Sequence, residues 1–241
     1  MRALKDILYF EMSKDSFRKT LRDMAFGNTE LEGSSVDAVN GYLAICRSIG
    51  ARRGKRLQLT QGLYANTFEW YISQLFVREF AARASGFGIR LKDADPGDEF
   101  DCVALLDEGL VFVECKTGKG SLYPEVGKFV RRDREVMAKY SFFLYDRDYT
   151  FNKGPEDLPE LEKASAVKLG IDSIARVEKG GCAFFEVTGI PNEHGETRFF
   201  LASSAFNGLR SRMRYMLRYT DHVREFENPT LDFVHIPLGF A

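Results

Sequence analysis

The chain has 241 residues, 44% of them hydrophobic, and a formal net charge of -1. Twenty-one Phe and ten Tyr against only seven Pro exclude a disordered or low-complexity chain and supply enough apolar side chains for a core. The length predicts either one large α/β domain or a core domain with an extension.

Charged residues interrupt the N-terminal stretch MRALKDILYFEMSK, which therefore lacks the continuous apolar core of a signal peptide. No other apolar run reaches the ~18 residues that a membrane helix needs. The four Cys residues include no C-x-x-C pair, which favours a reducing compartment. We therefore expect a cytoplasmic protein with no membrane partner.

The first part of the chain, residues 1–56, predicts a helical extension. One helix is expected at residues 13–26, with Ser13 as its N-cap. A second is expected at residues 34–50, where Gly50 closes it.

Residues 60–84 predict the next helix, because apolar residues recur there at helical spacing. The sequence SGFG at residues 85–88 predicts the end of this helix, and a short strand is expected at residues 88–92.

Two apolar runs at residues 100–106 and 110–116 are separated by the sequence DEG, which predicts a β-hairpin. A helix at residues 123–140 and a strand at residues 141–146 follow. The resulting order of helix, three strands, helix and strand predicts a mixed sheet flanked by helices.

The C-terminal third predicts further α/β elements without a composition break that would mark an independent domain, so we expect an elaboration packed on the same sheet. The expected elements are a helix at 160–170, strands at 171–177, 182–188 and 198–202, a basic helix at 204–226 and a last strand at 231–237. The expected divisions are an N-terminal extension at 1–56, a core at 57–178 and a C-terminal elaboration at 179–241.

Strand alternation places Glu114 and Lys116 on one face of the second hairpin strand. A tight turn at Glu108 and Gly109 would pair Asp101 with Lys116, whereas a four-residue loop would pair Asp101 with Glu114. Both registers bring the three side chains together on one face.

Two other acids, Asp98 and Glu99, compete with Asp101 if the strand begins differently.

Carboxylates held this close repel each other unless a cation lies between them. Mg²⁺ or Mn²⁺ suits such a pair, because Mg²⁺ prefers oxygen ligands and often takes only one or two protein carboxylates. A metal here could activate water for attack on a phosphodiester, and Lys116 could orient that water or stabilise the charged phosphorus.

Asp101, a hairpin and Glu114-Cys115-Lys116 resemble the D…(D/E)-x-K signature of the PD-(D/E)XK nuclease superfamily. The string EFDCVALLDEGLVFVECKTG is similar to the nuclease domain of CARF-containing CRISPR ancillary nucleases, where an E-C-K-T-G strand is typical. The resemblance covers residues from about 57 to 146, and the segment before Thr60 is too short for a CARF domain.

This resemblance implies a restriction-endonuclease-like αβββαβ core and a metal-dependent nuclease that acts on DNA or RNA and leaves a 5′-phosphate. It implies that Asp101 and Glu114 bind the metal together with the backbone carbonyl of Cys115, and that Lys116 is the catalytic lysine. Glu69 stands in the helix that often contributes a further glutamate. A role in prokaryotic or phage defence is compatible with this resemblance.

The alternative function is a nucleic-acid-binding or regulatory protein that keeps the fold without turnover. No nucleotide cofactor is expected, because KTGKGS at residues 116–121 lacks the earlier glycine of a phosphate loop. Many enzymes of the implied fold act as dimers, so a homodimer is one expected arrangement.

Two basic helices are candidates for contact with a nucleic-acid backbone. The alternative for each is an ordinary solvated helix face. The candidate residues are Lys128, Arg131 and Arg132 on the helix after the motif, and Arg210, Arg214 and Arg218 on the C-terminal basic helix.

Overall fold

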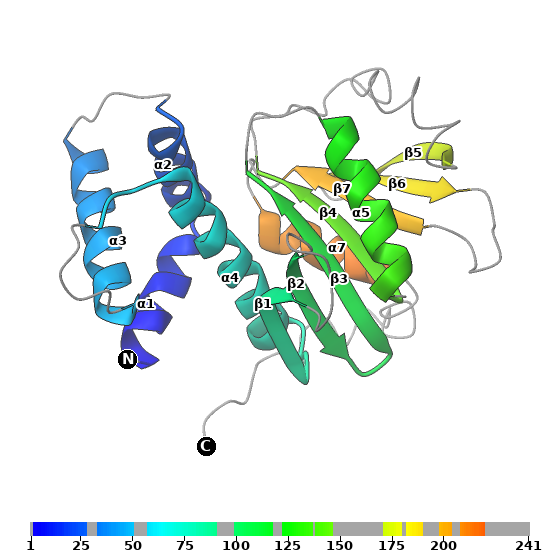
Figure 1. Cartoon of the computed structure of the whole chain (residues 1–241), viewed down its shortest axis with the longest axis horizontal. Helices are drawn as coiled ribbons and strands as arrows, with labels where there is room; N and C mark the ends of the chain where they lie inside the picture. The colour runs from blue at the N-terminus through cyan, green and yellow to red at the C-terminus, as the bar shows by residue number, and fades with distance from the viewer. Residues whose placement is uncertain are drawn as a thin grey trace.

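A seven-stranded mixed sheet flanked by helices organises the chain in a computed structural model (Figure 1). The structure describes residues 2–27, 33–50, 57–90, 99–117, 122–136, 138–146, 171–179, 182–189, 198–203 and 208–219.

The described helices are α1 (Arg2–Met12), α2 (Asp15–Ala25), α3 (Ser34–Gly50), α4 (Gln61–Glu79), α5 (Leu122–Val136) and α7 (Leu209–Tyr219). The strands are β1 (Ala84–Arg90), β2 (Glu99–Leu106), β3 (Gly109–Lys116), β4 (Tyr140–Tyr145), β5 (Ile171–Lys179), β6 (Cys182–Gly189) and β7 (Arg198–Ser203).

The strand order across the sheet is β1-β2-β3-β4-β7-β6-β5. Strands β1, β2 and β3 form an antiparallel meander, and β4 runs parallel to β3. Strand β7 runs parallel to β4, and β6 and β5 complete the sheet in antiparallel order. From α4 to β4, the order of helix, three strands, helix and strand confirms the order predicted from the sequence.

The expected boundary between residues 178 and 179 lies within β5, which pairs with β6 in the same sheet. The predicted elements at 160–170 and 231–237 lie outside the described residues, and the predicted basic helix is described only from residue 208 to 219. None of the described helices is long and apolar enough to cross a membrane.

The N-terminal helices differ from the prediction at Ser13. An additional helix, α1, continues to Met12, and the Ser13 hydroxyl donates a hydrogen bond to the carbonyl of Phe10 at its C-terminal end. The N-cap of α2 is Lys14, whose side chain makes no capping hydrogen bond. The predicted N-cap is therefore wrong, because Ser13 satisfies the preceding helix instead.

Helix α4 begins as predicted but ends earlier. The Thr60 hydroxyl accepts a hydrogen bond from the amide of Leu63 at 3.1 Å, as expected for an N-cap. The helix ends at Glu79 because Ala81 adopts a positive φ of 53°, after which the Ala82 amide bonds the Phe76 carbonyl. SGFG belongs to β1, so the prediction that it ends the helix is wrong.

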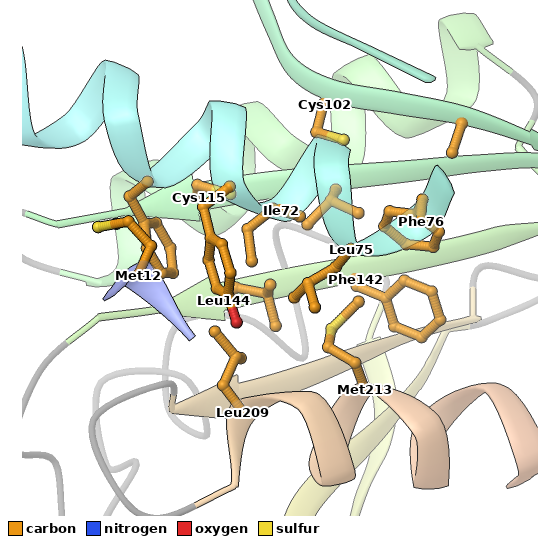
Figure 2. Packing of buried hydrophobic residues seen from close by; sticks show 14 of the residues in the cluster. Met12, Ile72, Leu75, Phe76, Cys102, Cys115, Phe142, Leu144, Leu209 and Met213 are labelled. Carbon is orange, nitrogen blue, oxygen red and sulfur yellow. The ribbon is translucent and has the colours of Figure 1, made fainter. Parts of the chain in front are cut away.

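Two apolar cores cover the two faces of the sheet. Residues from the N-terminal helices, α4 and α7 share the first core with β2, β3 and β4, including Ile72, Phe142 and Met213 (Figure 2). The second core lies under α5 and contains its apolar stripe of Val126, Phe129 and Val130. The sheet therefore holds α4 and α5 on opposite sides of β3.

Phe129 fixes the position of α5 on its face of the sheet. Its ring lies 5.1 Å from that of Phe112, 5.5 Å from that of Phe143 and 5.0 Å from that of Phe199, measured between centroids. These partners come from β3, β4 and β7. Aromatic pairs at this spacing add to the stabilisation from apolar burial, so α5 has a defined rotation and height above β3.

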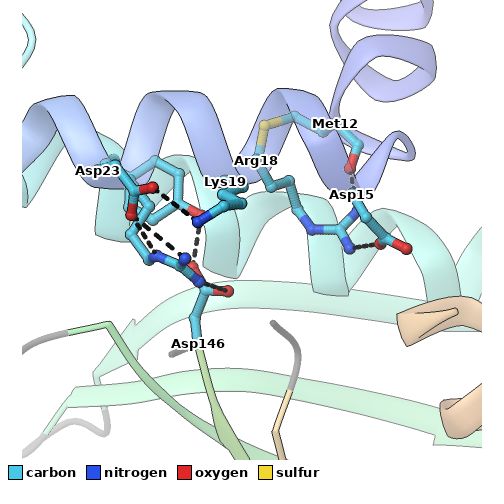
Figure 3. A network of polar contacts seen from close by, with 8 residues as sticks. Met12, Asp15, Arg18, Lys19, Asp23 and Asp146 are labelled. Carbon is cyan, nitrogen blue, oxygen red and sulfur yellow. Dashed lines mark hydrogen bonds and ion pairs between the residues drawn. The ribbon is translucent and has the colours of Figure 1, made fainter. Parts of the chain in front are cut away.

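A buried polar cluster attaches the N-terminal helices to the end of β4 (Figure 3). Asp146 follows β4 and accepts a hydrogen bond from the hydroxyl of Tyr64 on α4. One guanidinium nitrogen of Arg22, on α2, lies 3.6 Å from the other Asp146 oxygen. Because Asp146 is buried, these polar partners offset the cost of removing its charge from water.

Replacing Tyr64 by Phe tests this cluster. We expect Tyr64→Phe to lower the free energy of unfolding by about 1.5–3 kcal/mol, because a hydrogen bond to a buried charged group is lost. The matched control is Tyr71→Phe on the same helix, since the buried Tyr71 hydroxyl has no hydrogen-bond partner among the described residues. Urea denaturation measures both, and an equal loss in the two variants would contradict the expectation.

Candidate active site

The hairpin register brings Asp101 opposite Glu114. Leu106 pairs with Gly109, so the turn is Asp107–Glu108, one residue earlier than the predicted tight turn. The register predicted for that tight turn, with Asp101 opposite Lys116, is wrong. Continued past its last pair, Cys102 and Val113, the observed register would set Asp101 opposite Glu114, as in the alternative prediction, but with a two-residue loop instead of a four-residue loop.

Gly109 directly follows the two turn residues and has a φ of 151°, a backbone conformation that favours glycine. This conformation helps to fix the position of the turn.

Strands β2 and β3 stop pairing at Asp101. The last paired residues are Cys102 and Val113, and beyond them the Cys115 amide donates to Asp101 Oδ2 at 2.7 Å. On the other side of β2, Gly88 falls opposite Asp101 and has a φ of 58°. The Asp101 carboxylate thus replaces a backbone acceptor at the point where the hairpin opens.

Glu114 has a buried carboxylate that forms an ion pair with the guanidinium of Arg132. Glu114 is 5% exposed and Arg132 is 8% exposed. The Nη1 atom of Arg132 lies 3.0 and 3.1 Å from the two carboxylate oxygens of Glu114. Burial and then the negative charge of Asp101 raise the pKa of Glu114 to about 8, although Arg132 opposes both effects. Asp101 and Glu114 together are called the acid pair below.

Burial also raises the pKa of Asp101, to about 6. The Cys115 amide and then the charges of Arg132 and Lys116 oppose this rise in the pKa of Asp101, because they favour the ionised form. The acid pair therefore contains two carboxyl groups that cannot both be ionised cheaply near neutral pH.

Glu69, the glutamate that the family resemblance implied, lies on α4 within electrostatic range of the acid pair. It is half-buried, and its pKa is raised to about 8 by burial and then by the charges of Asp101, Glu99 and Glu114. Glu99 instead forms an ion pair with Arg90 on β1 at 2.8 Å. Asp98 lies outside the described residues.

Lys116 lies at the end of β3 and pairs with a residue that the sequence did not indicate. Its Nζ is 2.9 Å from Oε2 of Glu125, in the first turn of α5. Lys128 approaches the other Glu125 oxygen at 3.4 Å. Although burial opposes it, hydrogen bonding and charge from the two lysines lower the pKa of Glu125.

The basic residues of α5 divide between the surface and the site. Lys128 and Arg131 are exposed, as expected both for a face that contacts nucleic acid and for an ordinary solvated face. Arg132 is buried against Glu114 instead. Glu125, Phe129 and Arg132 follow at i, i+4 and i+7, which is one helix face, and this spacing was the available signal that both charged residues point toward the sheet.

The second basic row lies on the opposite side of the sheet. Helix α7 packs into the same core as α4, and Arg210 forms an ion pair with Glu79 at the C-terminal end of α4. Glu79 is ten residues beyond Glu69, or about 15 Å along the helix. Arg214 is exposed, and the Arg218 side chain is not among those described. The structure does not bring this row together with α5.

The acid pair suits a divalent cation with few protein ligands. Among the described residues, no group of three or more His, Cys, Asp or Glu side chains is arranged to hold a metal ion. Mg²⁺ commonly takes only one or two carboxylates and keeps waters in its other positions. The repulsion between Asp101 and Glu114, which raises the pKa of Glu114, is the repulsion that such a cation would relieve.

Comparison with protein-family models, curated proteins and solved structures finds no match for the chain. The chemistry of the site therefore has to be inferred from its own residues.

The raised pKa of Glu69 predicts a pH-dependent stability. Between its ordinary value of 4.5 and about 8, the native state retains a proton that the unfolded state has lost. Stability should therefore fall as pH rises through this window, and Glu69→Gln should reduce the slope.

Urea unfolding in EDTA from about pH 5 to about pH 9 measures the effect, with exposed Glu135→Gln as the control. An unchanged slope in Glu69→Gln would show that Glu69 does not carry the shifted pKa.

Proposed function

We propose that this protein is a metal-dependent nuclease that hydrolyses phosphodiester bonds of DNA or RNA. The observation that carries the proposal is the convergence of Asp101, Glu114 and Lys116 at the open end of the β2–β3 hairpin. Both carboxyl groups have raised pKa values, and perturbed acids next to a lysine are typical of catalytic sites.

The arrangement of elements supports the same proposal. Helix α4, the β1–β2–β3 meander, α5 and β4 follow in the αβββαβ order of the restriction-endonuclease-like fold. The acids lie on β2 and β3 and the lysine on β3, which are the positions that the D…(D/E)-x-K resemblance implies.

Asp101 and Glu114 would hold Mg²⁺ or Mn²⁺, with the Cys115 carbonyl as the third ligand that the resemblance implies. The ion would supply positive charge for the phosphate oxygens and make water a stronger nucleophile. Arg132 would compete with the ion for the Glu114 carboxylate, and its guanidinium would supply a second positive charge at the site.

In the proposed hydrolysis, a water oxygen forms a bond to phosphorus and loses a proton to solvent, the bond from phosphorus to the 3′ oxygen breaks, and that oxygen takes up a proton from solvent. The products carry a 5′-phosphate and a 3′-hydroxyl. Lys116 stabilises the negative charge that develops on the phosphate oxygens. Glu69, on α4 within electrostatic range of the acid pair, could orient the attacking water.

Conservative replacements of the acid pair test the assignment. We expect Asp101→Asn and Glu114→Gln each to reduce cleavage by at least about 100-fold, because removing electrostatic stabilisation of a transition state has effects of this size. Glu114→Gln is preferable to Glu114→Ala, which would leave the buried Arg132 without its carboxylate and cost about 3–5 kcal/mol of stability. EDTA should have the same effect on the wild type.

The substrates are labelled single- and double-stranded DNA and RNA, with Mg²⁺ or Mn²⁺ present. Asp107→Asn serves as the control, because this exposed carboxylate lies at the turn of the same hairpin and pairs with Arg83. Cleavage that persists at the wild-type rate in Asp101→Asn or Glu114→Gln would overturn the assignment.

One observation favours a second function, nucleic-acid binding without turnover. Arg132 already neutralises Glu114 from within the chain, so the site can persist without a metal. Binding that resists EDTA, no cleavage of any substrate above, and no heat of Mn²⁺ binding in calorimetry would support this alternative over a nuclease.

A further inference from the structure

Helix α5 supplies one charged partner to each charged residue at the end of β3. Arg132 contacts Glu114, and Glu125 contacts Lys116. The first of these contacts competes with a metal for Glu114, but the second leaves Lys116 close to the acid pair without occupying either carboxylate. This difference separates the roles of the two helix residues.

The ion pair between Lys116 and Glu125 is partly shielded from water. The two side chains are 28% and 18% exposed, and their charged atoms are 2.9 Å apart. A lysine side chain has about 2 kcal/mol of rotamer entropy when free, so a partly buried partner restricts where the ammonium group lies.

Lys116 has competing partners on its own hairpin. It follows Glu114 by two residues at the end of β3, and its positive charge favours the ionised forms of both Asp101 and Glu114. A lysine drawn onto either carboxylate would occupy a metal ligand and would leave the position from which it can reach a phosphate. Glu125 attracts it from α5 and opposes that movement.

We propose that Glu125 is a positioning residue for phosphodiester hydrolysis, because its carboxylate pairs with the Lys116 ammonium group and so keeps that group from binding either carboxylate of the acid pair. This inference rests on the proposed nuclease function. The ion pairs of Glu125 are with Lys116 and Lys128, so its effect on catalysis is exerted through Lys116.

Glu125→Gln tests this role because it keeps the size of the side chain and removes its charge. We expect kcat to fall by about 10- to 100-fold, as for other small displacements of catalytic groups, while KM changes by less than about twofold. Glu125→Asp keeps the charge on a shorter side chain and should recover part of kcat. Glu135→Gln, an exposed glutamate on the same helix, should behave as wild type.

A second measurement does not depend on cleavage. Brief treatment with an amine-reactive acylating reagent, followed by peptide mass spectrometry, reports how freely Lys116 reacts. Loss of the ion pair should make Lys116 acylate faster in Glu125→Gln than in the wild type or Glu135→Gln. Equal melting temperatures would show that the change is local.

The outcomes separate this inference from the function on which it rests. Faster acylation of Lys116 together with lower kcat supports the positioning role. Unchanged kcat in Glu125→Gln, or unchanged acylation of Lys116, overturns the role while leaving an active wild type as a nuclease. A wild type that cleaves none of the substrates overturns the nuclease and this inference with it.

Discussion

Mutual repulsion between two neighbouring carboxyl groups is the constraint around which the candidate site is organised. Asp101 and Glu114 follow the last pair of β2 and β3, and the burial of Glu114 and partial burial of Asp101 remove water that would screen their charges. The protein offsets this repulsion with a backbone amide on Asp101 and a guanidinium on Glu114. A divalent cation bound here would relieve the repulsion between the two carboxylates. Under the proposed function, the same cation would attract a phosphate that the carboxylates alone would repel.

Aromatic packing determines the position of α5 and therefore of the Arg132 guanidinium. Phe129 contacts rings from three strands, and its stacking on Phe112 sets α5 against the strand that carries Glu114. With the helix fixed there, Glu125 and Arg132 reach β3 from one turn before and one turn after the ring. The electrostatics of the site thus depend on an apolar contact that touches none of its charged atoms, and a small rotation of α5 would separate both ion pairs together.

The sequence predicted the acid-bearing hairpin because two apolar runs between residues 100 and 116 are separated by a short run of turn residues. It could not choose the register, since both turn lengths suited the same residues. It also could not assign Arg132 to the interior, because a long charged side chain can either reach solvent or bury, and the rotation of α5 decides which. The end of α4 was misplaced because Ala81 takes a conformation in which glycine is expected.

The pairing of β7 with β4 limits which part of the chain can fold alone. All six residues of β4 are buried, and β4 is paired on one side by β3 and on the other by β7, which begins only at Arg198. A fragment ending at residue 178 would contain the entire acid-bearing hairpin yet leave β4 as an open apolar edge, which is prone to aggregation. During synthesis the ribosome-bound chain presents the same edge until β7 has emerged. The half of the sheet that carries the candidate site is therefore not an autonomous folding unit.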